Sequence, residues 1–224
     1  MTDNIIKYAA PTAYQRARGR LSHKRQSIYQ HSPFLIQDIV NILPDPMTKT
    51  QNLHLDIGFG QGDELIQKCK NNPHELFLGI DLYRAGIAKV LEHIQHAAMT
   101  NLYLWEIDAA QAFKQCQDHS IDSIHIFHPD PWPKKRQHKR RLITQSFLLT
   151  ALSKCRPSGT IQILSDHPGY TDTIINITNS LQDQARITVE ANVKAITKYG
   201  HKAIAEGRSI TRISLSPTIM TSHN

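Results

Sequence analysis

Residues Leu53–Asp63, LHLDIGFGQGD, contain the pattern that decides the fold. The apolar run Leu53–Ile57 predicts a buried β-strand, and Gly58–Gly62 predicts a tight loop directly after it. The segment Asp63–Lys70 then predicts a helix, which the breaker Asn71-Asn72-Pro73 ends. A strand, a glycine loop and a helix in succession predict the first unit of an α/β fold.

The rest of the chain continues this alternation of strands and helices. Further strands are expected at Leu76–Ile80, Leu102–Ile107, Ile121–Phe127, Thr160–Ser165, Ile187–Val189 and Ile210–Leu215. Helices are expected at Ser32–Leu43, Arg84–Ala98, Ala109–Cys116, Lys139–Lys154 and Tyr170–Leu181. Strands separated by helices predict right-handed βαβ units, and therefore a mostly parallel sheet with helices on both faces.

Length and composition favour one compact domain. The chain has 224 residues, of which 40% are hydrophobic, and this is enough for a full α/β core. No apolar run approaches the roughly 20 residues of a membrane span, and the N-terminus lacks the order of charges and apolar residues found in a signal peptide. The three cysteines form no close pair. We therefore expect a cytoplasmic protein without a membrane segment.

Charge and histidine content indicate the kind of partner. The net charge of +7, with a pI near 9.4, favours a polyanionic partner. The thirteen histidines are scattered without the spacing of metal ligands, so no metal site is expected. Residues 1–45 are expected to form a basic N-terminal arm and helix, and residues 46–224 the remaining domain. For the arm, contact with an anion and a solvated tail are equally good interpretations.

Acidic residues follow the strands of the predicted sheet. They are Asp56, Asp81, Asp108, Asp130 and Asp166. Because parallel strands end at one edge of a sheet, we expect these carboxylates to lie on one rim, where α/β proteins bind ligands. Like charges raise one another's pKa values and cost free energy, so a role in ligand binding is favoured. The alternatives are a helix cap or a pair with Arg84 for Asp56 and Asp81, and helix caps for Asp108 and Asp166.

The glycine loop distinguishes between two nucleotide ligands. A dinucleotide-binding loop needs a small residue at its third conserved position, whereas this chain has Asp63 followed by Glu64. Two carboxylates there would repel a pyrophosphate. A ligand with a ribose, no phosphates and a positive charge fits better, and S-adenosylmethionine has these properties. We expect Asp81 to bind its ribose diol and Asp108 to lie near its adenine. A nicotinamide-dependent oxidoreductase is the disfavoured alternative.

The stretch His128–Arg141, HPDPWPKKRQHKRR, joins an acid to a dense cationic run. Asp130 follows the strand Ile121–Phe127, and six Lys or Arg lie between Lys134 and Arg141. The run is either a solvated surface or a contact with nucleic-acid phosphates. Its last three cations are expected to open a helix, where the helix dipole disfavours them, and this favours the phosphate role. Trp132 is interpreted as a packing anchor rather than a base-stacking platform.

Five segments together resemble one family. LDIGFGQGD, GIDLYRAGI, FHPDPWPKKRQHKRR, LSDHPGY and TKY stand in the order and spacing of the bacterial tRNA (guanine-N7)-methyltransferases, over roughly Arg18 to Tyr199. The resemblance implies a Rossmann-like class I methyltransferase with a seven-stranded sheet and S-adenosylmethionine as methyl donor. It also implies tRNA as partner, methylated at N7 of guanine 46 in the variable loop. Monomer and homodimer are both left open.

The resemblance also implies roles for individual residues, carried over position by position. Asp130 is the implied catalytic residue, and the implied donor site consists of Asp56, Gly58, Gly60, Asp81, Asp108 and Asp130. Implied substrate contacts are Lys134, Asp166, Thr197, Lys198, Tyr199 and Gly200. Implied RNA contacts are Arg136, Gln137, His138, Lys139, Arg140 and Arg141.

Gly200 departs from the family pattern, which has Glu at this position. Glu206 is a hypothetical replacement from the same segment. The departure keeps a second hypothesis open, that of a non-catalytic or altered-specificity RNA-binding relative.

Overall fold

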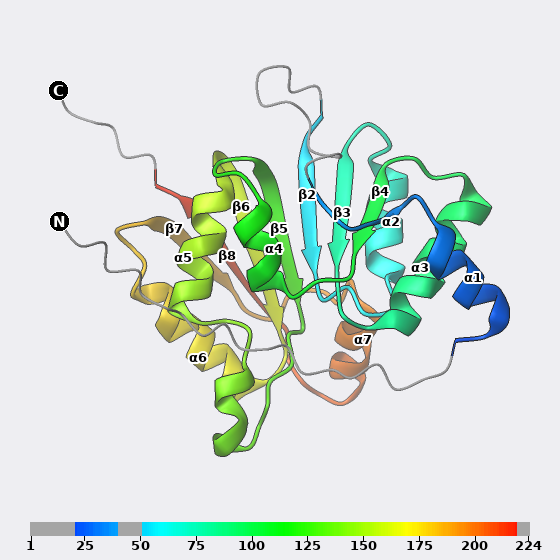
Figure 1. Cartoon of the computed structure of the whole chain (residues 1–224). Coiled ribbons are helices and arrows are strands. Elements are labelled where there is room, and N and C mark those ends of the chain that lie inside the picture. Colours follow the sequence, from blue (N-terminus) through cyan, green and yellow to red (C-terminus); the bar gives the residue numbers. More distant parts are fainter. Residues whose placement is uncertain (1–20, 40–50, 219–224) are drawn as a thin grey trace, which may run out of the picture.

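A single mixed sheet organises residues 21–39 and 51–218, the part of the chain that this computed structural model describes (Figure 1). Its strands are β1 (Leu35–Ile36), β2 (Leu53–Ile57), β3 (Leu76–Ile80), β4 (Leu102–Trp105), β5 (Ile121–Phe127), β6 (Cys155–Ser165), β7 (Ala185–Glu190) and β8 (Thr211–Pro217). Their order in the sheet is β1-β4-β3-β2-β5-β6-β8-β7. Neighbours from β1 to β6 run parallel, and β8 runs antiparallel to β6 and β7. The predicted fold class is confirmed, with the short β1 added at one edge.

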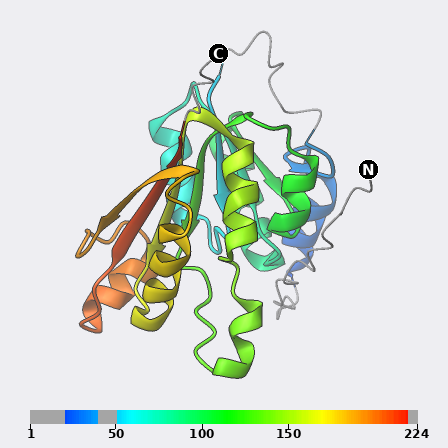
Figure 2. The same ribbon diagram turned by 90° about the vertical axis from the view of Figure 1, so that its left-hand side faces the viewer.

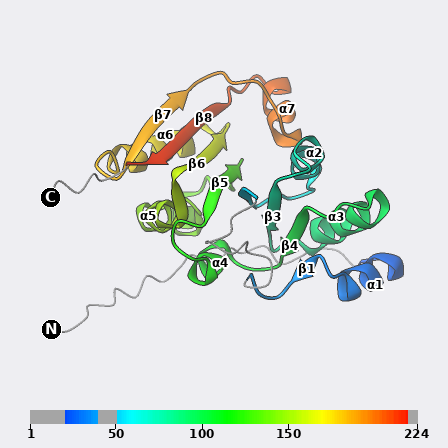
Figure 3. The ribbon, with the colours of Figure 1, turned by 90° about the horizontal axis from the view of Figure 1, so that it is seen from above.

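Helices cover both faces of the sheet. They are α1 (His23–His31), α2 (Asp63–Asn71), α3 (Arg84–Ala97), α4 (Ala109–Gln115), the 3₁₀ helix η1 (Lys135–Arg140), α5 (Gln145–Lys154), α6 (Pro168–Asn179) and α7 (Lys198–Ala205). Figure 3 shows α1, α2 and α3 on one side and α4, α5 and α6 on the other. All five residues of β3 are buried: Phe77 packs in the core under α2 and α3, and Leu78 packs in the core of the opposite face.

The expected helix at Ser32–Leu43 is wrong for residues 32–39, and residues 40–43 lie outside the described part. The helix lies earlier in the chain, at His23–His31, and Ser32 ends it in an extended conformation. Pro33 explains the difference, because a proline disfavours the helical conformation of the residue before it. Within the expected basic arm, Lys24 and Arg25 pair with Glu92 of α3 at 2.7 and 3.0 Å. Residues 1–20 of the arm are not described.

The expected helix Lys139–Lys154 is also wrong in its first part. The basic run forms η1, Arg141 is extended, and α5 begins only at Gln145. Thr144 explains this start, since its side chain accepts the N–H of Phe147 at 3.2 Å and caps α5. The helix dipole was expected to disfavour these cations at a helix start and so to favour a phosphate role. That argument does not hold, because Lys139 and Arg140 end η1 and do not open α5.

Two short helices at the carboxyl edge of the sheet, α7 and η1, were not predicted from the sequence as separate elements. Helix α7 was not expected, and Thr197 begins it by accepting the N–H of Gly200 at 2.9 Å. Figures 1 and 2 show η1 as the green turn that projects beyond this edge, next to α5. Within residues 21–39 and 51–218, no helix has both the length and the apolar character needed to span a bilayer.

Candidate active site

A cavity of about 630 Å³ opens at the carboxyl edge of the sheet. It is lined by segments that follow β2, β3, β4, β5 and β6, and by side chains from α7 and the loop before β8. A volume of this size suits a small-molecule ligand. Eight of the residues predicted for the site line it: Gly58, Gly60, Asp81, Asp108, Asp130, Arg140, Asp166 and Tyr199.

The glycine loop leaves space for a ligand to approach the backbone. Gly58 and Gly60 have φ values of 74° and 57°, in the left-handed region that favours glycine. A Cβ at Gly58 would meet no protein atom within 4 Å, so the space in front of it belongs to the cavity. Gly86 in α3 allows close packing rather than ligand approach, because a Cβ there would overlap the carbonyl oxygen of Gly60. The helix therefore packs directly on the loop.

Asp81 ties the glycine loop to the end of β3. Its two carboxylate oxygens accept the backbone N–H groups of Gly60 at 2.7 Å and Tyr83 at 2.9 Å. Burial raises the pKa of Asp81, although these backbone hydrogen bonds act to lower it. The alternative pair with Arg84 does not form, since Arg84 contacts Glu106 at 2.6 Å.

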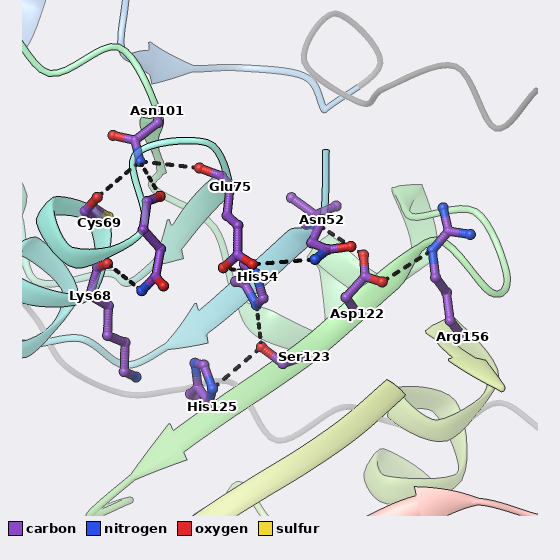
Figure 4. A network of polar contacts seen from close by, with 12 residues as sticks. Asn52, His54, Lys68, Cys69, Glu75, Asn101, Asp122, Ser123, His125 and Arg156 are labelled. Carbon is purple, nitrogen blue, oxygen red and sulfur yellow. Dashed lines mark hydrogen bonds and ion pairs between the residues drawn. The ribbon is translucent and has the colours of Figure 1, made fainter. Parts of the chain in front are cut away.

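Asp56 is buried near the end of β2, where its carboxylate contacts Lys68. Its carboxylate lies 3.1 Å from the Nζ of Lys68, its residue is 5% exposed, and it is not among the lining residues. Figure 4 shows the polar network beside it: Ser123 contacts His54 at 2.7 Å and His125 at 3.3 Å. Of the six residues predicted for the donor site, Asp56 is the one that does not line the cavity. Its role in donor binding stays a prediction.

The loop after β5 has an unusual backbone. His128 and Trp132 have φ values of 50° and 43°, which are rare for residues with a side chain. His128 is held by Asp166, whose Oδ1 lies 2.7 Å from its Nδ1, and Arg208 binds Oδ2 of Asp166 at 2.9 Å. Burial acts to raise the pKa of Asp166, but the hydrogen bonds and charges of these two partners outweigh it, so the pKa is lowered.

Helix caps account for several predicted residues. Asp108 caps α4 by accepting the N–H groups of Ala110 and Gln111 at 3.0 and 3.3 Å, and it also lines the cavity. Asp166 is not a cap, because His167 caps α6. Gly200 is buried in the first turn of α7, where an added Cβ would lie 3.0 Å from Ile210. Its neighbours leave little room for a larger residue.

The basic run divides into an exposed and a buried part. Its exposed residues are Lys134, Lys135, Arg136, His138, Lys139 and Arg140, and Gln137 is half-buried. The guanidinium of Arg140 lies 5.0 Å from the centre of the Trp132 ring. Arg141 is only 6% exposed. Its predicted RNA contact stays a prediction, and its burial favours a contact inside the protein.

Among the cavity residues that sequence reasoning missed are Tyr83, Lys202 and Arg208. Lys202 lies three residues after Tyr199, so both would have been expected on one helix face had α7 been recognised. Thr197 was the available signal for that helix. Arg208 follows the left-handed Gly207 in a loop without a motif. Glu206, the hypothetical replacement, forms an ion pair with Arg208.

Comparisons with known proteins agree with this geometry. The model of a family described as putative methyltransferase matches residues 50–213. A tRNA (guanine-N(7)-)-methyltransferase of Buchnera aphidicola subsp. Schizaphis graminum is 32% identical over 70% of this chain and 68% of its own. One of Wolbachia pipientis wMel is 29% identical over 84% and 81%, respectively.

A solved structure supports the fold independently. A SAM-dependent methyltransferase from Archaeoglobus fulgidus covers 89% of this chain and 95% of its own, with a TM-score of 0.51 and 16% identity. At this identity the likeness concerns the fold alone. The family match and the relatives carry the assignment, and the chain belongs to the family of bacterial tRNA (guanine-N7)-methyltransferases.

Proposed function

We propose that the protein transfers a methyl group from S-adenosylmethionine to N7 of guanine 46 in the variable loop of tRNA, in the cytoplasm. One observation carries the proposal: Asp130 lines the same cavity as the glycine loop and Asp81, and the exposed basic run follows it directly in the chain. A donor pocket, an acid and a cationic surface therefore meet at one edge of the sheet. The names of the relatives support the reaction and the substrate.

The cavity fits the methyl donor. Gly58 leaves open space for close approach, and the Asp81 carboxylate at the end of β3 keeps further lone pairs to accept the hydroxyls of a ribose. Asp63 and Glu64 in the first turn of α2 disfavour a pyrophosphate there, and with it a nicotinamide dinucleotide. When bound, S-adenosylmethionine would supply an electrophilic methyl group on a positively charged sulfur.

Asp130 provides charge stabilisation in this proposal. Guanine N7 has a lone pair and no proton, and it lies on the exposed major-groove edge of the base, so its methylation needs no general base. The methylated purine is cationic, and a nearby carboxylate stabilises the charge that develops in the transition state. The remaining acceleration comes from holding the reacting atoms in line.

The RNA would be held by two further surfaces. The exposed cations of η1 are placed to contact phosphates, which are the main source of affinity for nucleic acids. Tyr199 of α7 is 64% exposed and lines the cavity, where its ring is able to contact the target base. Lys134, Asp166, Lys198 and Lys202 complete the proposed substrate surface.

The test is to incubate the protein with isotopically labelled S-adenosylmethionine and unmodified tRNA, and to map the modified nucleoside by nuclease digestion and mass spectrometry. We expect 7-methylguanosine at position 46. Binding of tRNA without transfer would instead support the RNA-binding relative. Binding of a nicotinamide dinucleotide without binding of the methyl donor would contradict the methyltransferase function.

A further inference from the structure

Arg141 differs from the other cations of the basic run in its surroundings. Its neighbour Arg140 is exposed, whereas Arg141 is 6% exposed and begins the segment that leads into α5. Burying a guanidinium costs free energy unless hydrogen bonds and favourable charges compensate for it. The contacts that compensate for the burial of Arg141 therefore indicate its role.

These contacts join Arg141 to two segments that are distant in sequence. Its Nε donates to the carbonyl oxygen of Pro131 at 2.9 Å, and its Nη1 donates to Oγ1 of Thr173 in α6 at 3.0 Å. Its guanidinium also lies 4.6 Å from the centre of the Tyr170 ring. Tyr170 is fully buried, and its hydroxyl accepts the N–H of Ile143 at 3.0 Å. Arg141 is thus fixed to the rigid start of α6.

The loop that Arg141 holds is rich in proline. Pro129, Pro131 and Pro133 have no backbone N–H, so the loop cannot donate a backbone hydrogen bond at these three positions. Pro131 directly follows Asp130, so the contact with its carbonyl fixes the Pro131–Trp132 peptide unit, one residue after the proposed catalytic residue. The charge of Asp130 is also felt at Tyr170, where it contributes to a raised pKa behind the larger effect of burial.

We propose that Arg141 is a positioning residue that holds the Asp130 loop in its catalytic geometry, and that it does not contact RNA. The proposal rests on the proposed function, because it takes Asp130 as the catalytic group. A planar guanidinium donates from Nε and Nη1 in fixed directions and stacks on a ring at the same time, which a lysine ammonium does not do. The position accordingly requires arginine rather than a positive charge.

Steady-state kinetics of Arg141→Ala and Arg141→Lys test the proposal, with Lys139→Ala as the matched variant from the exposed part of the same run. We expect kcat to fall about a hundredfold in both Arg141 variants, as for a misplacement of about 1 Å. We expect the salt dependence of tRNA binding to stay as in the wild type. In Lys139→Ala the slope of log K for tRNA against log salt concentration should fall by about one unit. A lowered slope with wild-type kcat in the Arg141 variants would overturn the proposal.

Chemical rescue separates positioning from a general loss of structure. Ethylguanidinium added to Arg141→Ala should restore part of kcat, while ethylammonium at the same ionic strength should not. Equal effects of the two cations would contradict a guanidinium-specific contact. If Arg141→Ala does not fold, Thr173→Val decides the matter, because it removes one anchor and keeps the arginine. We then expect a smaller decrease of kcat, and a wild-type kcat would overturn the proposal.

Fluorescence quenching makes the test independent of methyl transfer. The chain has two tryptophans, and Trp105 is 2% exposed, so acrylamide quenching reports mainly on Trp132 in the held loop. Quenching should increase in Arg141→Lys and Thr173→Val, and it should be unchanged in Lys139→Ala. If the wild type does not methylate tRNA, the proposed function fails, and quenching alone decides on Arg141. Unchanged quenching in both test variants would then overturn the positioning role.

Discussion

The Nδ1 of His128 lies 2.7 Å from Oδ1 of Asp166, and this contact joins the ends of two neighbouring strands, β5 and β6. The other oxygen of Asp166 binds Arg208 at 2.9 Å, from the loop that precedes β8. One carboxylate therefore holds three segments of the cavity wall together. Asp166 thus holds the loop at His128, before the proposed catalytic Asp130, whereas Arg141 holds it at Pro131, after that residue.

Replacing Asp166 with Asn should loosen this junction and change the response of stability to acid. The pKa of Asp166 is lowered in the folded state, so its contribution to stability is fully present above the unfolded pKa of about 3.9. The contribution is lost as the pH falls through the lower, folded pKa. In Asp166→Asn we expect lower stability at pH 7, and a smaller loss of stability in acid, measured by urea unfolding between pH 3 and 7. A parallel pH profile in the two proteins would contradict the assignment.

Asp130→Asn should leave the fold intact and remove most of the turnover. The substitution keeps the shape of the side chain but removes the charge that stabilises the cationic product. Loss of one such preorganised electrostatic group lowers kcat by about 10²- to 10³-fold. Circular dichroism checks the fold, and single-turnover methylation of tRNA measures the rate. A single-turnover rate equal to that of the wild type would remove Asp130 from the mechanism.

The parallel part of the fold was predictable because local and long-range signals agree there. The strand predicted at Leu76–Ile80 coincides with β3, because a continuous apolar run is what a strand covered on both faces requires. The helix expected at Ser32–Leu43 was predicted wrongly for residues 32–39, since its apolar spacing was followed and the effect of Pro33 on Ser32 was not. A periodic pattern therefore needs its boundary residues before it locates a helix.

The site was predictable where a residue follows a strand, and not where tertiary packing decides its role. Asp81 and Asp130 line the cavity because parallel strands bring their carboxyl ends to one edge. Asp56 also lies at such an end, yet its carboxylate contacts Lys68 and does not line the cavity. Arg141 lies within a charge run whose composition does not show that one of its cations is buried against α6.

Asp81→Ala should weaken binding of S-adenosylmethionine and leave the affinity for tRNA unchanged. The Asp81 carboxylate would accept hydroxyls of the ribose, and it also holds the glycine loop through Gly60. Hydrogen bonds to a charged group contribute about 1.5–3 kcal/mol, so we expect the Kd for the donor to rise about 10- to 100-fold. Isothermal titration calorimetry measures the donor, and filter binding measures the tRNA. An unchanged Kd for the donor would place the ribose elsewhere.

Binding of tRNA should depend steeply on salt, because the exposed cations of η1 are proposed to displace counterions from phosphates. A plot of log K against log salt concentration should have a slope of several units. The variants Lys135→Ala and Arg136→Ala should each lower this slope by about one unit. Lys114→Ala, in α4 outside the basic run, provides the control and should keep the wild-type slope. A flat salt response in the wild type would rule out phosphate contacts by η1.

The polar network of His54, Ser123 and His125, on β2 and β5, should make the protein less stable in mild acid. Burial, together with the positive charges of Lys68 and His54, holds the pKa of His125 well below its ordinary value of 6.5. His125 therefore binds a proton near pH 6.5 in the unfolded chain, but only at lower pH in the folded chain. Stability is full above about pH 6.5 and is lost as the pH falls toward the folded pKa, by at most about 1.4 kcal/mol per pH unit.

His125→Gln keeps a hydrogen-bonding partner for Ser123 without this proton, so its unfolding free energy should fall less between pH 7.5 and 5.5. The exposed His74, replaced in the same way, should leave the wild-type loss unchanged, and an equal loss in all three proteins would show that His125 does not cause it.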